Sequence, residues 1–348
     1  MVVVGVDAHK RSHTLVAVDG NGRVMGQTTV RATSAGHLEA VKWVAQFDRE
    51  RMWAIEDCRN MTRRFESELL AAGETVIRVP TKMMAGTRKS ARESGKSDPI
   101  DAAAVARAAL REPDLPRAHL DGPAREVKLL IDYRESLVRE RTAAQNRLRW
   151  RLHELAPEFD PPSGSLSRYR TLDRTVALLE DHTGLIAELA RREVARIRAI
   201  TAEANQLEAQ IRDLVTQVAP SLLELPGCGA LSAAKLVGET AGIERFRSRD
   251  AFAMWAGVAP IPVWSGNPNK YRLNRGGNRQ ANAALYRIAI TQLRIHPQAQ
   301  AYIQKRIAAG NSKKEAIRAL KRRLADRVYQ TLIHDAQNHQ TTTQLKAA

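Results

Sequence analysis

Residues 1–30, MVVVGVDAHKRSHTLVAVDGNGRVMGQTTV, hold the strongest structural signal in the chain. They contain three short apolar runs, the last of which follows a Gly20–Asn21–Gly22 turn: Val2–Val6, His13–Val18 and Val24–Val30. Such runs, separated by brief turns, are typical of strands that pair antiparallel with their neighbours in sequence. We therefore expect the chain to open with a three-stranded meander.

Helices and strands alternate after this opening. The apolar spacing predicts a helix at Ala35–Phe47, a strand at Met52–Ile55, a helix near Thr62–Ala72 and a strand at Thr75–Val79. A further helix is expected to start near Asp98. The resulting order, βββ-α-β-α-β-α, is that of the RNase H-like fold, so the sequence predicts an α/β domain of this kind over residues 1–112.

The middle of the chain, residues 113–220, reads as a linker followed by helices. Residues 113–124 contain three prolines and a glycine, and the helix expected at Glu126–Leu155 is rich in arginine. Further on, apolar residues recur every three or four positions, which predicts either a coiled-coil seam or an amphipathic helix packed on its own domain. The seam residues are Ile197, Ile200, Ala204, Leu207, Ile211, Leu214 and Val218.

Charge separates the last part of the chain from the rest. The 348 residues include 55 Lys and Arg against 38 Asp and Glu, a net charge of +17, yet residues 251–314 contain no acid at all. A solvated surface normally mixes both signs, so this span indicates contact with phosphate. We expect a C-terminal nucleic-acid-binding domain at 221–335 and a flexible tail at 336–348.

Composition excludes several other classes of protein. Two cysteines, Cys58 and Cys228, are too few for a disulfide framework or a cysteine-based zinc site. No apolar run approaches the roughly 20 residues of a membrane span, so no membrane partner is expected. The expected location is the bacterial cytoplasm, with association to the nucleoid during activity.

Four acids are candidates for metal binding. Asp7 ends the first strand, Glu56 ends the fourth, and Asp98 and Asp101 lie three residues apart at a helix start. In an RNase H-like fold these positions converge, and a crowd of hard carboxylate oxygens selects Mg²⁺ or Mn²⁺. Two alternatives remain open: Asp98 before Pro99 is also typical of a helix cap, and strand alternation does not decide between Glu56 and Asp57.

Two C-terminal motifs are candidates for phosphate chemistry. Leu225–Glu239 resembles a helix-hairpin-helix, whose backbone N–H groups hold a phosphate, although a plain interhelical turn has the same pattern. Ser265 lies in a Pro/Gly-rich loop among cations, where it acts either as a nucleophile or as a phosphate-binding hydroxyl. The surrounding cations are Lys270, Arg272, Arg275 and Arg279.

Together these motifs resemble a known family. ValAspAlaHisLys at 6–10, IleGluAsp at 55–57 and LysSerAspProIleAspAlaAla at 96–103 resemble the DEDD transposases of bacterial insertion sequences, insertion-sequence family one-ten, which includes the Piv-type invertases. Leu225–Glu239 and Gly257–Asn282 resemble that family's C-terminal transposase domain. The resemblance extends over nearly the whole chain and keeps the motifs in order.

The resemblance implies a RuvC-like N-terminal domain in which Asp7, Glu56, Asp98 and Asp101 bind metal. It implies that Ser265 forms a covalent phosphoserine with DNA, that a bridge RNA pairs with donor and target DNA, and that tetramers build composite active sites. The seam and the arginine-rich helix would then serve subunit contact and RNA binding, through Arg147, Arg149 and Arg151. Trp264 departs from the small residue that many relatives have before the serine. The Asn-Pro-Asn after Gly266 departs from the short Gly/Lys connection that is more common at that point.

The sequence thus favours an RNA-guided, Mg²⁺-dependent (or Mn²⁺-dependent) DNA recombinase that works by serine transesterification, as a dimer or tetramer. A RuvC-like junction nuclease that uses water is the close alternative, and a non-catalytic basic nucleic-acid-binding protein is the alternative from another class. The four acids disfavour the last, since a packaging protein gains nothing from carboxylates beside phosphate.

Overall fold

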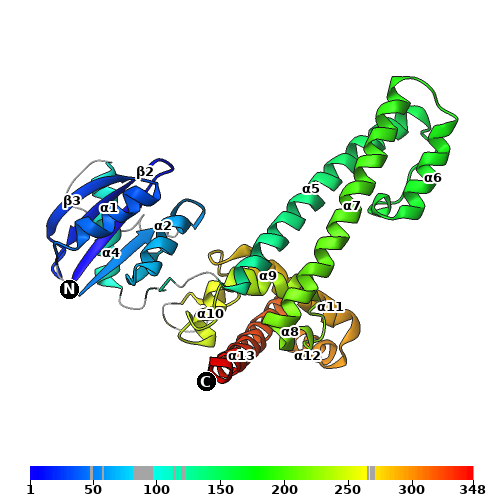
Figure 1. The fold of residues 1–348 in the computed structure, drawn as a ribbon. Helices are drawn as coiled ribbons and strands as arrows, with labels where there is room; N and C mark the ends of the chain where they lie inside the picture. The colour runs from blue at the N-terminus through cyan, green and yellow to red at the C-terminus, as the bar shows by residue number, and fades with distance from the viewer. Residues whose placement is uncertain are drawn as a thin grey trace. The chain divides into compact units, whose positions relative to one another are not determined.

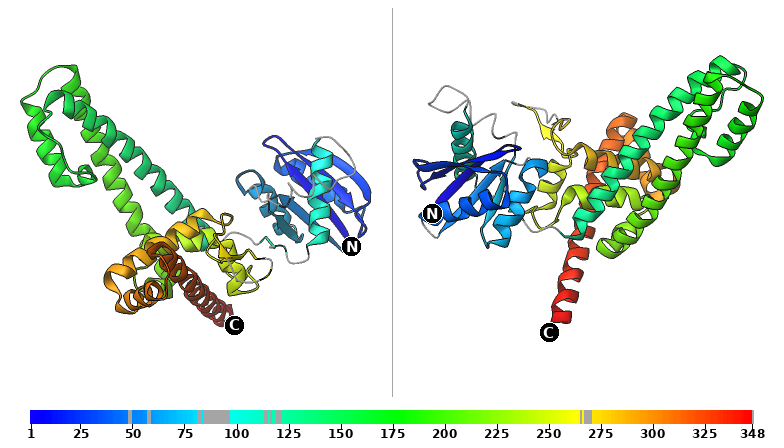
Figure 2. Two further views of the ribbon diagram at one scale, coloured as in Figure 1. Left: turned by 180° about the vertical axis from the view of Figure 1, so that it is seen from behind. Right: turned by 45° about the horizontal axis from the view of Figure 1, so that its top comes forward.

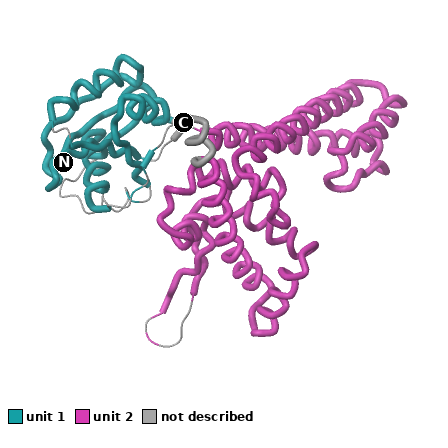
Figure 3. Tube along the Cα trace, turned by 60° about the horizontal axis from the view of Figure 1, so that its bottom comes forward, with its two compact units in different colours: residues 1–121 teal, residues 122–348 magenta. Residues whose placement is uncertain are grey.

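The computed structural model describes residues 1–47, 50–56, 59–80, 83, 97–112, 115, 117–118, 122–264, 266 and 271–347. The chain divides into two compact units, residues 1–121 and 122–348 (Figure 3). Each unit has hydrophobic clusters of its own. The finer division predicted from the sequence, with boundaries at residues 112, 220 and 335, stays a prediction.

Unit 1 is built on a five-stranded sheet with the order β3-β2-β1-β4-β5 (Figure 1). The first three strands pair antiparallel, and β4 and β5 add parallel to β1 on the other side. The predicted meander and RNase H-like strand order are therefore confirmed. The strands are β1 (Val2–Ala8), β2 (Ser12–Val18), β3 (Val24–Arg31), β4 (Arg51–Glu56) and β5 (Val76–Val79).

Helices cover both faces of this sheet. Helices α1 (Ser34–Val44) and α2 (Arg59–Ala71) pack on the face that carries Val4 and Val6. Helix α4 (Asp98–Arg111) packs on the opposite face, beside Val3. Figure 1 shows α1 on the near side of the sheet, and the view from behind in Figure 2 shows α4. Both sides of β1 are buried, which explains its unbroken apolar sequence.

Helix α4 lies unusually close to β1 at Gly5. A Cβ atom at this position would come within 1.9 Å of the carbonyl oxygen of Ala102 and 2.7 Å of the amide nitrogen of Ala106. Only glycine permits such an approach between a strand and a helix backbone. The alanine-rich face of α4 serves the same end, because small side chains keep the two backbones together.

Unit 2 begins with a long helical hairpin. Helix α5 (Pro123–Leu155) runs antiparallel to α7 (Leu185–Val218), with α6 (Tyr169–Glu180) near the turn (Figure 1). Ion pairs fix the register, among them Arg134 with Glu208 at 2.6 Å. Pro123 is in the first turn of α5, so the segment expected to be a linker ends earlier than predicted.

The predicted seam faces the interior of its own chain. Ile197, Ile200, Ala204, Leu207 and Ile211 of α7 are all buried, and α5 is the helix that packs along them. This arrangement is the one that the amphipathic-helix alternative predicts. Two of the seven seam residues, Leu214 and Val218, are only partly buried, at the base of the hairpin.

The remainder of unit 2 packs around the base of the hairpin in one cluster. Its elements are α8 (Pro220–Leu223), α9 (Ala230–Thr240), α10 (Arg249–Trp255), β6 (Ile261–Pro262), β7 (Tyr271–Arg272), α11 (Arg279–Ile295), α12 (Pro297–Ala308) and α13 (Lys313–Ala347). The segment expected to be a flexible tail, 336–348, is helical as far as Ala347. No glycine or proline follows Gly310, so nothing in the sequence stops the helix. No helix among the described residues is long and apolar enough to cross a membrane.

Candidate active site

The carboxyl ends of β1 and β4 bring the first two candidate acids next to each other. The two strands are parallel, with Val6 opposite Ile55, so Asp7 and Glu56 follow at adjacent positions. Strand alternation places both on the sheet face that α4 covers. Asp57, the alternative to Glu56, lies outside the described residues.

Helix α4 supplies the other two acids. Ser97 occupies the cap position, with extended φ and ψ of −151° and 155°, and Asp98 is the first helical residue. The cap interpretation of Asp98 is therefore wrong: proline in the first turn marks the helix start correctly, but the cap lies one residue earlier. Asp101 follows one turn later and is 7% exposed.

A histidine that the sequence reasoning did not single out joins this cluster. Nε2 of His9 lies 3.1 Å from Oδ2 of Asp7 and 3.4 Å from Oδ1 of Asp98. One ligand atom from each of these three residues lies within 4.8 Å of the other two. The spacing in the sequence could have identified His9, because a residue two positions after Asp7 on an extended chain points to the same side.

The electrostatics of Asp7 show how crowded the cluster is. Burial raises the pKa of Asp7 above its ordinary value; the nearby His9 opposes this rise, and Asp101 and Asp98 add to it. The two α4 acids thus lie near enough to Asp7 to act on its carboxylate through space. A cation would relieve this repulsion. Carboxylate oxygens with one imidazole nitrogen suit Mg²⁺ or Mn²⁺, so the residues present fit such an ion.

The candidate nucleophile Ser265, with Lys270, lies outside the described residues. The ends of its loop are described: Pro262 of β6 pairs with Tyr271 of β7, so the loop leaves and re-enters at one place. Arg272, Arg275 and Arg279 are exposed. Within the described part of the chain none of these three side chains forms an ion pair, which leaves their charges available to an anion.

The arginines of α5 are differently placed. Arg147 binds Glu193 of α7 through two hydrogen bonds of 2.7 and 3.1 Å, and Arg151 lies 3.7 Å from the same carboxylate. Arg149 donates to the carbonyl oxygens of Pro161 and Pro162. These residues therefore hold the hairpin and its loop together, and their RNA-binding role stays a prediction.

The predicted helix-hairpin-helix forms a tight turn between α8 and α9. Gly227 adopts a left-handed φ of 79° there. Cys228 is buried, which raises the pKa of its thiol to about 12, so the thiol is not suited to act as a nucleophile near neutral pH. Lys235 is 1% exposed and its ammonium lies 3.0 Å from Asp132 and 2.9 Å from Glu135. This lysine therefore joins α9 to α5 and does not face a phosphate.

Comparison with known proteins gives matches at both ends of the chain. Residues 4–157 match the family model DEDD_Tnp_IS110, described as "Transposase", and residues 219–304 match "Transposase IS116/IS110/IS902 family". A 42-kDa protein of insertion element IS900 from Mycobacterium paratuberculosis is 26% identical to this chain, and the alignment covers 98% of both proteins. A 44.8-kDa protein of insertion element IS116 from Streptomyces clavuligerus is also 26% identical to this chain. The alignment covers 93% of this chain and 92% of the IS116 protein.

Among solved structures, RuvC of T. thermophilus in complex with a Holliday junction substrate matches with a TM-score of 0.27 and 15% identity. The match covers 34% of this chain and 99% of RuvC.

Proposed function

Because this chain belongs to the IS110 family of insertion-element transposases, we propose that it is an RNA-guided recombinase that cuts and rejoins DNA through a covalent phosphoserine at Ser265. One observation carries the proposal: β1 and α4 bring Asp7, Asp98 and Asp101 together, with His9 within 3.4 Å of two of them. Glu56 ends the neighbouring strand. An acid cluster of this kind has a use in DNA strand transfer and none in passive DNA binding.

The acid cluster is proposed to hold Mg²⁺ or Mn²⁺. When bound, the ion would supply positive charge for a phosphodiester whose bonds are changing. Asp7 and Asp98 provide oxygens from the strand end and the helix start, and Asp101 is held beside them by the contact at Gly5. His9 is in position to orient both carboxylates.

The serine loop is proposed to supply the nucleophile. The Ser265 oxygen attacks phosphorus, a serine–phosphate ester forms, one bond from phosphorus to a DNA oxygen breaks, and the proton lost by serine is balanced by one gained at the departing oxygen. The reverse step with a new DNA end restores a phosphodiester, so no nucleotide hydrolysis is needed. Arg272, Arg275 and Arg279, exposed and without a carboxylate in the described part of the chain, support charge stabilisation at such a phosphate.

The partners follow from the same proposal. Donor and target duplexes are the substrates, a bridge RNA selects them, and a homodimer or tetramer combines the acid cluster of one subunit with the serine loop of another. The net charge of +17 supports binding to more than one nucleic-acid strand. The RNA and the oligomer rest on family resemblance.

A denaturing gel with labelled DNA tests the mechanism. The wild type should form a DNA–protein adduct that maps to Ser265, and Ser265→Ala should still bind DNA but form no adduct. Ser163→Ala is the matched control, because Ser163 also precedes a glycine in a proline-rich loop but lies in the hairpin. Efficient cleavage with no adduct would instead support the nuclease that uses water, for which Ser265 is a phosphate contact.

A further inference from the structure

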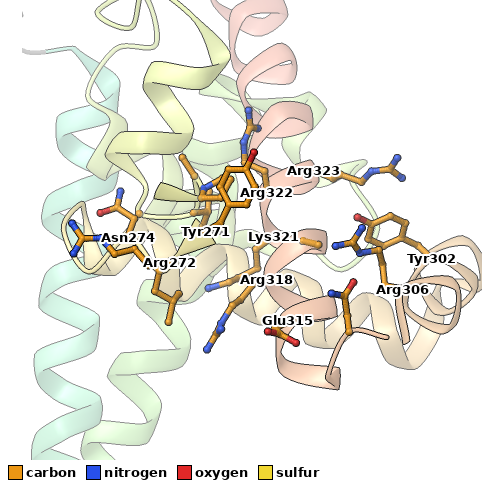
Figure 4. Close-up of a pocket in the computed structure, with 17 residues that line it drawn as sticks. Tyr271, Arg272, Asn274, Tyr302, Arg306, Glu315, Arg318, Lys321, Arg322 and Arg323 are labelled. Carbon is orange, nitrogen blue, oxygen red and sulfur yellow. The ribbon is translucent and has the colours of Figure 1, made fainter. Parts of the chain in front are cut away.

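A cationic groove lies in unit 2 between β7 and the helices α12 and α13. We call it the α12–α13 groove; its volume is about 660 Å³, and β7, the segment 257–260, α12 and α13 line it. Figure 4 shows Tyr271 and Arg272 approaching from one side, Tyr302 and Arg306 from the other, and the α13 side chains between them. Six of its lining residues are cations and one, Glu315, is an acid. The cations are Arg272, Arg306, Arg318, Lys321, Arg322 and Arg323.

The chain neutralises only part of this charge. Arg322 pairs with Asp250 at 2.5 Å and also with Asp326. Glu315 accepts hydrogen bonds from the amide and hydroxyl of Ser312, a capping box at the start of α13. These hydrogen bonds, with help from Arg318, hold the pKa of Glu315 below its ordinary value, so this acid stays ionised.

None of the other cations forms an ion pair with a carboxylate in the part of the chain that the structure describes. The Lys321 ammonium donates to the Asn282 side-chain oxygen at 2.8 Å, and burial together with repulsion by Arg318 holds its pKa below the ordinary value. Arg323 stacks 4.3 Å above the Tyr302 ring. Nε of Arg306 is buried and has no hydrogen-bond partner among the described residues. Cations that lie this close together repel one another. Their arrangement therefore indicates a site that binds an anion.

Aromatic rings stand at the edge of this groove. Tyr271 lines it and meets the Trp264 ring edge to face, with centroids 5.1 Å apart. Both rings are exposed, Tyr271 by 59% and Trp264 by 44%. Exposed rings beside a basic groove are the features with which proteins bind unpaired nucleotides, because bases stack on rings while cations follow the backbone.

We propose that the α12–α13 groove and the Trp264–Tyr271 pair bind an unpaired stretch of the DNA strand that is cut. The phosphates lie along Arg306, Arg318 and Arg323, and a base stacks on Tyr271. This inference rests on the proposed function, because Trp264 directly precedes Ser265 in the chain. Whichever strand reacts with that serine must pass the aromatic pair, and the strand that reacts is DNA.

Binding assays with the full chain carrying Ser265→Ala test the proposal without any contribution from adduct formation. The probes are a fluorescent oligothymidylate, a duplex of equal length and an RNA of equal length. Tyr271→Ala should weaken oligothymidylate binding roughly 5- to 150-fold, the range for loss of one stacked base. Tyr271→Phe keeps the ring and should bind as the parent does.

A second pair of variants tests the binding of phosphates. Arg318→Ala with Arg323→Ala should flatten the log–log salt dependence for oligothymidylate by about 1.4, or roughly 0.7 for each phosphate that is no longer neutralised. Arg294→Ala is the matched control: this exposed arginine lies on α11, and it lines neither the groove nor the neighbouring pocket that Arg323 shares with Tyr302. Its salt dependence should not change.

A direct readout places the strand. Oligonucleotides containing iodouracil, irradiated on the protein, should crosslink to the peptide that ends at Arg272 and contains Tyr271. No loss of oligothymidylate binding, an equal loss for the duplex, or a loss at least as large for RNA would each overturn the proposal, the last by assigning the groove to RNA. An absent adduct in the wild type would refute the nucleophile alone, since these measurements do not depend on it.

Discussion

The contact between Gly5 and helix α4 gives the sharpest test of how the fold builds the acid cluster. In Gly5→Ala the new methyl group would lie 1.9 Å from the Ala102 oxygen, and real Cβ atoms essentially never come closer than 3.0 Å. The gap must therefore open by about 1.1 Å. The three obstructing atoms are two backbone atoms of α4 and the Cβ atom of Ala106. None of them can rotate away, so the helix itself must move.

Two losses follow from that displacement. Overpacking of this kind costs about 1–3 kcal/mol of unfolding free energy, which lowers the midpoint of thermal unfolding by several degrees. The helix also carries Asp98 and Asp101 away from Asp7, and the 3.4 Å contact between His9 and Asp98 opens. Displacing such positioned groups lowers metal affinity roughly 10- to 100-fold.

Calorimetric titration with Mn²⁺, paired with thermal unfolding, measures both losses on one sample. Gly20→Ala is the control, because a Cβ atom at Gly20 meets nothing within 4 Å and its φ is not left-handed. It should leave the Mn²⁺ affinity and the unfolding midpoint as in the wild type. Wild-type Mn²⁺ affinity in Gly5→Ala would refute the view that this contact positions the acids.

Three further outcomes are expected. His9→Ala should weaken Mn²⁺ binding more than Mg²⁺ binding in calorimetric titration, because imidazole suits Mn²⁺ better than Mg²⁺; equal losses would mean that His9 acts only through the carboxylates. His13 is 1% exposed and burial lowers its pKa to about 4 from 6.5, so protonation favours the unfolded chain. Stability, complete above about pH 6.5, should fall by about 2 kcal/mol on going to pH 5, and His13→Phe, measured by urea unfolding, should remove that pH dependence. Lys235→Met should cost about 2 kcal/mol in the same assay, because Asp132 and Glu135 lose a buried partner, and Lys235→Arg should be worse tolerated than a surface exchange such as Lys314→Arg.

The fold of unit 1 was predictable because its signals are local. Each strand can be predicted from a few consecutive apolar residues, and the Gly20–Gly22 turn predicts the connection between the second and third strands. Glu56 and Asp7 were found for the same reason, as the polar residues that end apolar runs. Even the helix start near Asp98 was visible, although the cap fell on Ser97, because proline constrains the position of a helix start only to within a residue.

What the sequence did not reveal depends on contacts between distant segments. The groove draws on Arg272, Arg306 and Arg318, which share no periodicity and meet only when α12 and α13 fold back on the β6–β7 hairpin. Lys235 is buried between Asp132 and Glu135, which lie about a hundred residues earlier in the chain. Residue spacing in the sequence does not predict contacts between segments that lie so far apart in the chain.

The α5–α7 hairpin has a consequence for the reach of this protein. Its tip has a separate apolar cluster around α6, and only a small cluster, Leu137, Ile200 and Leu207, links the tip to the base. Helices of this length extend about 50 Å. Removing one heptad from each helix would shorten the arm by about 10 Å and keep the apolar faces in phase. The length of the hairpin can thus be changed in steps of one heptad without altering the elements that pack around its base.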